Sequence, residues 1–134
     1  MVPEYVSFAN IIIDDIVLSD GRTFMNTLGG AGPHALVGMR IWSQRLGLVA
    51  TIGSHFEPHH WAQLEQLGVD LRGVFERESV PTARAWQLYD PDGQRTEVFR
   101  TATTVLDELR PRLEELPEDY LRARGFHLIS GSDL

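Results

Sequence analysis

Two short stretches of the sequence carry residues whose types and spacing could do chemistry. Asp14 and Asp15 end an apolar run, and Gly29, Gly30 and Gly32 stand directly before a segment that we expect to be helical. A carboxylate accepts hydrogen bonds from hydroxyl groups, and such charge-assisted bonds are comparatively strong. Closely spaced glycines let the main chain approach another group. The group that approaches them could be a phosphate, a sugar, or simply a neighbouring strand.

The glycines match part of a known phosphate-binding pattern. GAGPHA, at residues 30–35, fits the G-x-G-x-x-A fingerprint, in which a helix N-terminus receives a pyrophosphate. However, about ten polar residues separate these glycines from the preceding strand, and the second strand is followed by TIGSHF rather than by an acid. A Rossmann-type dinucleotide-binding domain therefore stays an alternative, whereas a P-loop is excluded because no lysine follows the glycines.

The elements that must position these residues follow from the apolar pattern. Four segments read as strands, three as amphipathic helices, and DPDG at 90–93 reads as the turn of a hairpin over 83–100. The expected strands cover 5–18, 46–53, 69–74 and 126–130, and the expected helices cover 33–45, 58–67 and 104–116, with a short helical piece near 118–124. This order predicts a parallel sheet covered by helices, with a separate antiparallel piece.

Composition limits the classes of function. The chain has 134 residues, a formal net charge of −7 and no cysteine. An acidic balance argues against nucleic acid or an anionic membrane as the main partner. The absence of cysteine favours a reducing compartment, and no apolar run approaches the roughly 20 residues that span a bilayer. We expect a cytoplasmic protein whose core is that of one domain.

Taken in order, the motifs resemble the N-terminal half of the ribokinase-like (PfkB) family of small-molecule kinases. ANIIIDDIV, LGGAGPHALVGMR, LGLVATIGS, LEQLGVDLRGV and PTARAWQLYDPDGQRTEVF carry the resemblance, which is nearest to the divergent MAK32-like branch. It implies an α/β, ribokinase-like parallel sheet covered by helices, with a small antiparallel lid made of segments 16–28 and 83–100. Residues 1–134 would then be the N-terminal, incomplete part of such a domain.

The resemblance also assigns roles to individual residues. Asp14 would bind substrate hydroxyls, and the Gly29–Gly30 main chain would lie against the sugar or nucleoside. His34 replaces the asparagine that is common in the family, and its imidazole can still bind a hydroxyl group. Trp86 and Phe99 would cover the substrate from the lid. Asp15 is expected to be solvated or to lie in a turn.

The function implied is ATP-dependent phosphorylation of a hydroxyl group of a sugar or nucleoside, with ATP and Mg²⁺ as cofactors of the full-length protein. The family's late glycine-rich anion hole and its catalytic aspartate have no counterpart here; SGSDL, at the end, does not fit them. We therefore expect no catalytic residue in this chain. A non-catalytic sugar- or nucleoside-binding or regulatory protein is the alternative, and a homodimer could form through the lid. His55, Glu57, His59 and His60 are expected to be polar helix-start surface rather than a metal site.

Overall fold

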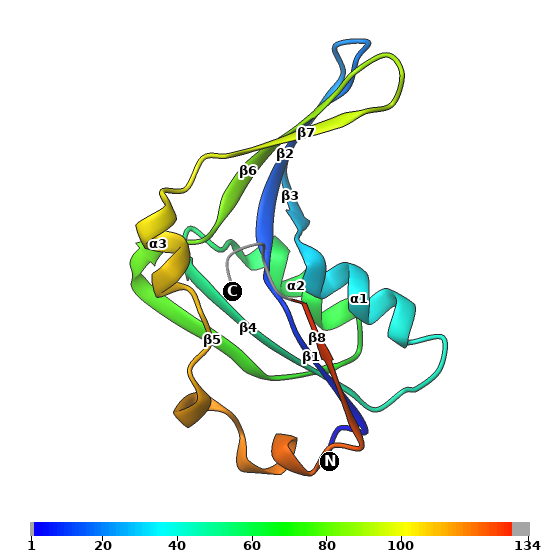
Figure 1. The fold of residues 1–134 in the computed structure, drawn as a ribbon, viewed down its shortest axis with the longest axis vertical. Helices are drawn as coiled ribbons and strands as arrows, with labels where there is room; N and C mark the ends of the chain where they lie inside the picture. Colours follow the sequence, from blue (N-terminus) through cyan, green and yellow to red (C-terminus); the bar gives the residue numbers. More distant parts are fainter. Residues whose placement is uncertain (1, 130–134) are drawn as a thin grey trace.

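The computed structural model describes residues 2–129; the terminal SGSDL segment considered above begins at residue 130 and lies outside them. Two four-stranded sheets make up the fold, one stacked beyond the end of the other (Figure 1). We call them the core sheet and the lid sheet. The chain passes from one to the other through residues 9–11, between β1 and β2.

The core sheet is entirely parallel. Its order is β5-β4-β1-β8, with the strands β5 (Asp70–Pro81), β4 (Leu46–Ser54), β1 (Tyr5–Phe8) and β8 (Gly125–Leu128). Strand β4 is buried over nearly its whole length, which is typical of a strand covered on both faces. Helices α1 (Ala31–Met39) and α2 (Pro58–Gln66) pack on one face through Leu36 and Leu64. Tyr120, from the 3-10 helix η2 (Glu118–Arg122), packs against Val6 and Val49.

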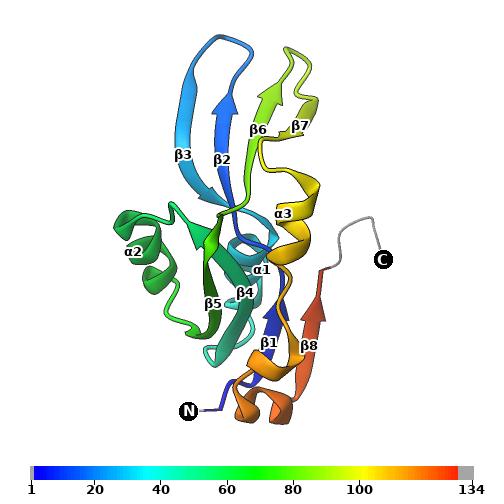
Figure 2. The same cartoon turned by 90° about the vertical axis from the view of Figure 1, so that its left-hand side faces the viewer.

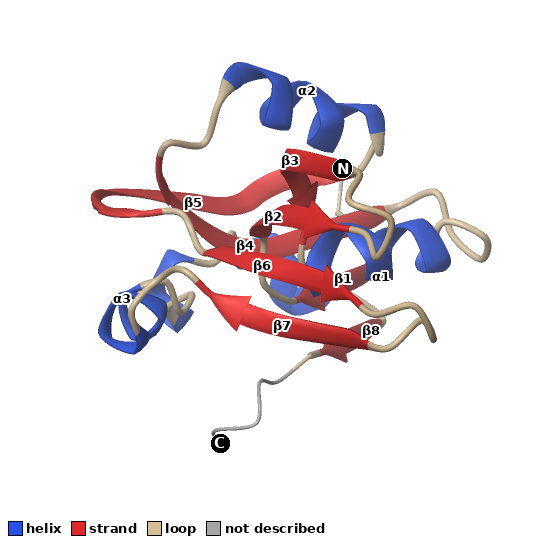
Figure 3. Ribbon diagram, turned by 90° about the horizontal axis from the view of Figure 1, so that it is seen from above, coloured by secondary structure: helices blue, strands red, loops and turns tan. Residues whose placement is uncertain are grey.

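The lid sheet extends away from the core (Figure 2). Its order is β3-β2-β6-β7, with the strands β3 (Thr23–Gly29), β2 (Ile12–Val17), β6 (Arg84–Tyr89) and β7 (Arg95–Phe99). Strands β2 and β6 are parallel, and the two outer pairs are antiparallel (Figure 3). Segments 16–28 and 83–100 do form one small sheet, but the expectation of an antiparallel lid is wrong, because β2 and β6 run parallel and make the sheet mixed.

Several element boundaries differ from the expectations. The strand expected over 5–18 is two strands in different sheets, because the chain turns at residues 9–11. The helix expected over 33–45 begins at Ala31 and ends at Met39, so Trp42 lies beyond it and is 87% exposed. The strand expected over 69–74 extends to Pro81.

The amphipathic segment 104–116 is also shorter than expected. Helix α3 covers only Thr103–Glu108, and the 3-10 helix η1 (Leu113–Glu115) follows after Pro111. A proline inside a helix removes a hydrogen bond and clashes with the preceding turn, so the leucine periodicity alone predicted too long a helix. Among residues 2–129, no helix is both long enough and apolar enough to cross a membrane.

Candidate functional site

The Asp14 carboxylate lies against the glycine turn. Asp14 is in β2 and pairs with Thr27 of β3, while Gly29 pairs with Ile12, so all four side-chain positions share one face of the lid sheet. A Cβ atom built on Gly29 would collide with Asp14 Oδ2 and Cγ. Glycine is required at position 29 because the carboxylate occupies the space that any side chain would fill.

Asn10 holds the start of α1 in place. Its side-chain Oδ1 accepts a hydrogen bond from the Ala31 main-chain N–H at 2.8 Å, and its carbonyl accepts one from the Gly32 N–H at 2.8 Å. Gly30 has φ +90°, and a Cβ there would lie 2.7 Å from the Ile12 nitrogen. These glycines therefore serve close packing of the chain on itself, in addition to any contact with a ligand.

The same contacts argue against the dinucleotide-binding alternative. That fingerprint needs its glycines after a strand of a parallel sheet, whereas β3 belongs to the lid sheet and runs antiparallel to β2. Two of the N–H groups at the start of α1 already donate to Asn10 and are unavailable to a pyrophosphate. The Rossmann interpretation of residues 30–35 is therefore wrong.

Asp14 is partly buried and belongs to a polar cluster on the lid. Its Oδ1 accepts a hydrogen bond from Gln87 Nε2 at 3.0 Å, and the same nitrogen donates to Glu97 Oε2 at 2.6 Å. Burial raises the pKa of the Asp14 carboxyl above its usual range; the hydrogen bond from Gln87 acts in the opposite direction, and the nearby Glu97 raises it further. His34 and Arg95 lie close enough to lower it slightly.

Asp15 does not behave as expected. It is fully buried rather than solvated, and its carboxylate accepts two hydrogen bonds from Arg84, one from Arg100 and one from the Asn26 main-chain N–H. The hydrogen bonds from Arg84 hold the pKa of the Asp15 carboxyl well below its usual range. Successive residues of a strand point to opposite faces, so this anchored acid directs Asp14 to the other face of the lid sheet.

The β3 bulge joins the lid to α2. Asn26 adopts φ +59° at an irregularity in the β2–β3 pairing, and its side-chain nitrogen donates to Glu57 Oε1 at 3.0 Å. The buried His60 donates from Nε2 to the Asn26 carbonyl at 3.0 Å and accepts the Glu57 N–H on Nδ1. Burial lowers the pKa of His60, which agrees with this neutral, accepting state. Glu57 and His60 therefore cap α2 and support β3.

The register separates the two aromatic residues expected to cover a substrate. Phe99 pairs with Ala85, which pairs with Asp14, so Phe99 lies on the face of Asp14. Trp86 pairs with Asp15 and lies on the opposite face, where the Arg100 guanidinium stacks 4.8 Å from its ring centroid. Phe99 and Trp86, both expected to cover a substrate, therefore lie on opposite faces of the lid sheet, and only Phe99 shares the face of Asp14.

His34 lies exposed in the first turn of α1. Its Nδ1 hydrogen-bonds the Gly30 carbonyl at 2.7 Å, which leaves Nε2 as the ring nitrogen without a protein partner in residues 2–129. The imidazole thus sits over the glycine turn and beside Asp14, whose pKa it influences. A ligand resting on this turn would meet the imidazole edge.

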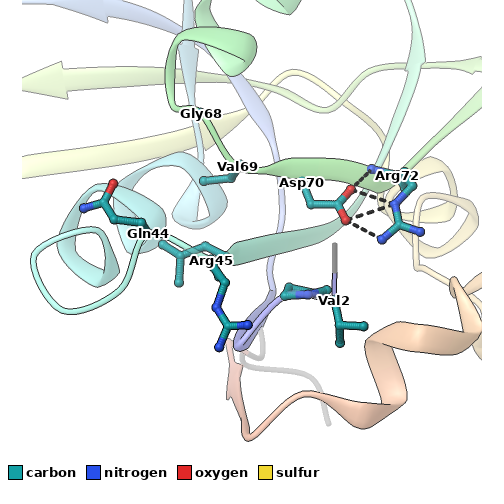
Figure 4. A pocket seen from close by; sticks show the side chains of 9 residues that line it. Val2, Gln44, Arg45, Gly68, Val69, Asp70 and Arg72 are labelled. Carbon is teal, nitrogen blue, oxygen red and sulfur yellow. Dashed lines mark hydrogen bonds and ion pairs between the residues drawn. The ribbon is translucent and has the colours of Figure 1, made fainter.

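A pocket of about 560 Å³ opens at the carboxyl ends of β1 and β8, next to this cluster. Ile12 and Phe99 line it, and both lie on the Asp14 face of the lid sheet. In open α/β sheets, ligands bind at the carboxyl ends of the strands. A second pocket of about 390 Å³ lies at the opposite ends of β4 and β5 and is lined by Arg45 and by the Asp70–Arg72 ion pair (Figure 4). Its position is the less favourable one for a ligand site.

Solved structures share this fold over most of the chain. A PfkB protein from a Polaromonas species has a TM-score of 0.73 at 15% identity, over 93% of this chain and 44% of that chain. A nucleoside kinase from Burkholderia thailandensis, solved with inosine, has a TM-score of 0.59 at 15% identity over 72% of this chain and 35% of its own. A ribokinase from Cryptococcus neoformans, solved with ADP, has a TM-score of 0.58 at 18% identity over 73% and 34%.

The chain has a ribokinase-like fold. It spans less than half the length of each of these ribokinase-like proteins. In sequence, it is 40% identical over 81 residues to an uncharacterised protein of Schizosaccharomyces pombe, which corresponds to 57% of this chain and 22% of that protein. No protein-family model matches the chain.

Within this ribokinase-like fold, the structure brings together Asp14, Gly29, Gly30, His34 and Phe99, and it separates Trp86 from them. Sequence reasoning missed Asn10, Gln87 and Glu97. Strand alternation could have placed Gln87 and Glu97 on one face of the hairpin, because the DPDG turn fixes the pairing of 84–89 with 95–99. Asn10 gives no comparable signal, since its contact with Ala31 spans 21 positions.

Proposed function

We propose that this chain is the substrate-binding part of an ATP-dependent kinase that phosphorylates a hydroxyl group of a sugar or nucleoside. The observation that carries the proposal is the Asp14 carboxylate lying against the Gly29–Gly30 turn, on the lid face that borders the larger pocket. The ribokinase-like fold, shared with nucleoside kinases and ribokinases, supports it. We also propose a cytoplasmic location.

In this proposal, each residue has a defined task. The Asp14 carboxylate accepts hydrogen bonds from ligand hydroxyls, and the exposed imidazole of His34 offers a further polar contact at the same turn. Phe99 supplies apolar cover from β7. A lid that closes over the ligand excludes water, so that a phosphoryl group would be transferred to the ligand rather than to water.

The described residues do not by themselves provide a site for the cofactors of such a kinase. The fold implies ATP with Mg²⁺, but among residues 2–129 no group of three His, Asp or Glu side chains lies close enough to hold a metal ion. A Mg²⁺ ion that accompanies a nucleotide is held mainly by phosphate oxygens, water and one or two carboxylates, so we derive no phosphoryl-transfer step from the residues that the structure describes. Their proposed contribution is to bind and orient the acceptor hydroxyl.

The test is a calorimetric titration of sugars and nucleosides into the protein and into its Asp14→Asn variant. We expect at least one polyhydroxylated compound to bind, and its affinity to fall about tenfold or more in the variant, because a charge-assisted hydrogen bond is lost. Asp20→Asn, which alters an exposed acid paired with Arg22, is the matched control and should leave binding unchanged. Absence of binding to the unmodified protein, or equal binding by Asp14→Asn, would overturn the proposal.

A non-catalytic binding protein is the second candidate. The observation in its favour is His34, which replaces the asparagine that is common in the family. Its Nδ1 is engaged with the Gly30 carbonyl, so the polar contact offered to a ligand at the glycine turn differs from the usual one. An assay of ATP-dependent phosphorylation of the bound compound separates the two, since a binding protein would hold the ligand without consuming ATP.

A further inference from the structure

Three polar side chains from three different strands meet on the Asp14 face of the lid. Gln87 of β6 pairs across the sheet with Glu97 of β7, and it lies two residues further along β6 than Ala85, the partner of Asp14. Strands β2, β6 and β7 lie side by side in that order (Figure 3). The three side chains therefore form a single cluster, although they are far apart in the sequence.

The orientation of the Gln87 amide follows from its neighbours. Its nitrogen lies 3.0 Å from Asp14 Oδ1 and 2.6 Å from Glu97 Oε2, and only an N–H group can lie between two carboxylates favourably. Both amide hydrogens are thus used. Gln87 is buried, with only 5% of the residue exposed, and its side-chain carbonyl oxygen has no hydrogen-bond partner within residues 2–129. The Gln87 amide thus donates to both the Asp14 and the Glu97 carboxylates and fixes their relative position.

Within the cluster, the carboxylate oxygens that Gln87 does not bind remain as hydrogen-bond acceptors. Gln87 satisfies one oxygen of each carboxylate, while Asp14 Oδ2 faces the glycine turn and Glu97 remains exposed on β7. The other ionisable groups that act on Asp14 here are His34 and Arg95. A ligand that brings hydrogen-bond donors can bind both neighbouring carboxylates, because a hydrogen bond to a charged group is comparatively strong.

We propose that Glu97, held in place by Gln87, is a second acceptor beside Asp14 and selects ligands with hydroxyl groups on neighbouring carbon atoms. This inference rests on the proposed function and deepens it, because it names the pair of neighbouring hydroxyl groups as the part of the substrate that the lid residues recognise. Glu97 specifies the ligand, and Gln87 is a positioning residue that acts through the two carboxylates. Because Glu97 comes from the lid, the diol is recognised only when the lid lies over the ligand.

The test compares inosine with 2′-deoxyinosine and 3′-deoxyinosine in calorimetric titrations of the protein and of its variants. The unmodified protein should bind inosine about tenfold or more tightly than at least one deoxy analogue. In Glu97→Ala, this preference should fall to about threefold or less through weaker binding of inosine, while binding of that deoxy analogue is retained. Gln87→Met, which keeps the length of the side chain without its amide, should reduce the preference in the same direction.

Glu78→Gln, which alters an exposed acid on β5, is the control and should keep the full preference. An equal loss of affinity for all three nucleosides in Glu97→Ala would indicate a merely structural role and overturn the inference. An unchanged preference in Glu97→Ala would also overturn it, while leaving the proposed function intact. Failure of the unmodified protein to bind any sugar or nucleoside would overturn the proposed function itself, and this inference with it.

Discussion

The Arg84 guanidinium donates two hydrogen bonds to the Asp15 carboxylate, both at 2.7 Å, although the two residues are 69 positions apart in the chain. The pair fastens β6 to β2 on the face of the lid opposite to Asp14. Its consequence for the site is indirect, since the acid that is anchored on one face determines where its neighbour points.

Replacing Asp15 with asparagine should destabilise the protein strongly. The change removes the buried carboxylate that Arg84 and Arg100 share; since the two arginine side chains are themselves 34% and 40% exposed, the cost should be about 1–3 kcal/mol. Urea denaturation measures the free energy of unfolding. Asp20→Asn, which breaks an exposed pair with Arg22, should cost about 1 kcal/mol or less. Equal effects of the two substitutions would contradict the anchoring role of Asp15.

The lowered pKa of Asp15 makes the free energy of unfolding depend on pH. Hydrogen bonds from Arg84 depress the pKa of folded Asp15 below its usual value of 3.8, so the unfolded chain binds the proton more readily. The contribution is complete above about pH 5 and is lost progressively as the pH falls below that. The free energy of unfolding, followed by urea denaturation from pH 6 to pH 3, should therefore decrease. The decrease should be shallower in Asp15→Asn, and an identical slope would show that Asp15 is not the group responsible.

Replacing Asp14 with asparagine should have the opposite effect on stability. Burial raises the pKa of this carboxyl, so keeping it ionised costs more free energy in the folded protein than in the unfolded chain. Any stability linked to Asp14 is present at low pH and is lost as the pH rises through the folded-state pKa. Asp14→Asn should therefore unfold at a higher temperature at neutral pH, with a gain of about 0.5–2 kcal/mol, while losing ligand affinity. A loss of stability in thermal denaturation would mean that Asp14 serves the fold rather than a ligand.

Substitution of Gly29 tests whether the glycine turn packs against the Asp14 carboxylate. Gly29→Ala places a methyl group where the Asp14 carboxylate lies, so it should destabilise the protein by about 1–3 kcal/mol and displace the carboxylate. Gly38→Ala, inside α1 with no atom within 4 Å of its new methyl group, should instead stabilise the protein by about 0.4–1 kcal/mol. Thermal denaturation of both variants is the measurement, and a neutral Gly29→Ala would show that the two groups do not touch in solution.

The sequence alone predicted the alternation of strands and helices and the hairpin around DPDG, because each has a local signal, whereas the proximity of the lid segments was implied only by the family resemblance. The anchoring of Asp15 could not be predicted, since a carboxylate at a strand end looks the same whether it meets solvent or two distant arginines. The faces of Trp86 and Phe99 depend on register, which the turn fixes within the hairpin but not between β6 and β2.

Nuclear magnetic resonance tests the central claim most directly. Amide spectra of the ¹⁵N-labelled protein are recorded during titration with ribose and with inosine. The account predicts that one of these ligands shifts the amide signals of Gly29, Gly30 and Ala31, and that Asp14→Asn abolishes these shifts. Ligand-induced shifts confined to the opposite end of the sheet, around Arg45 and Asp70, or shifts at the glycine turn that persist unchanged in Asp14→Asn, would contradict it.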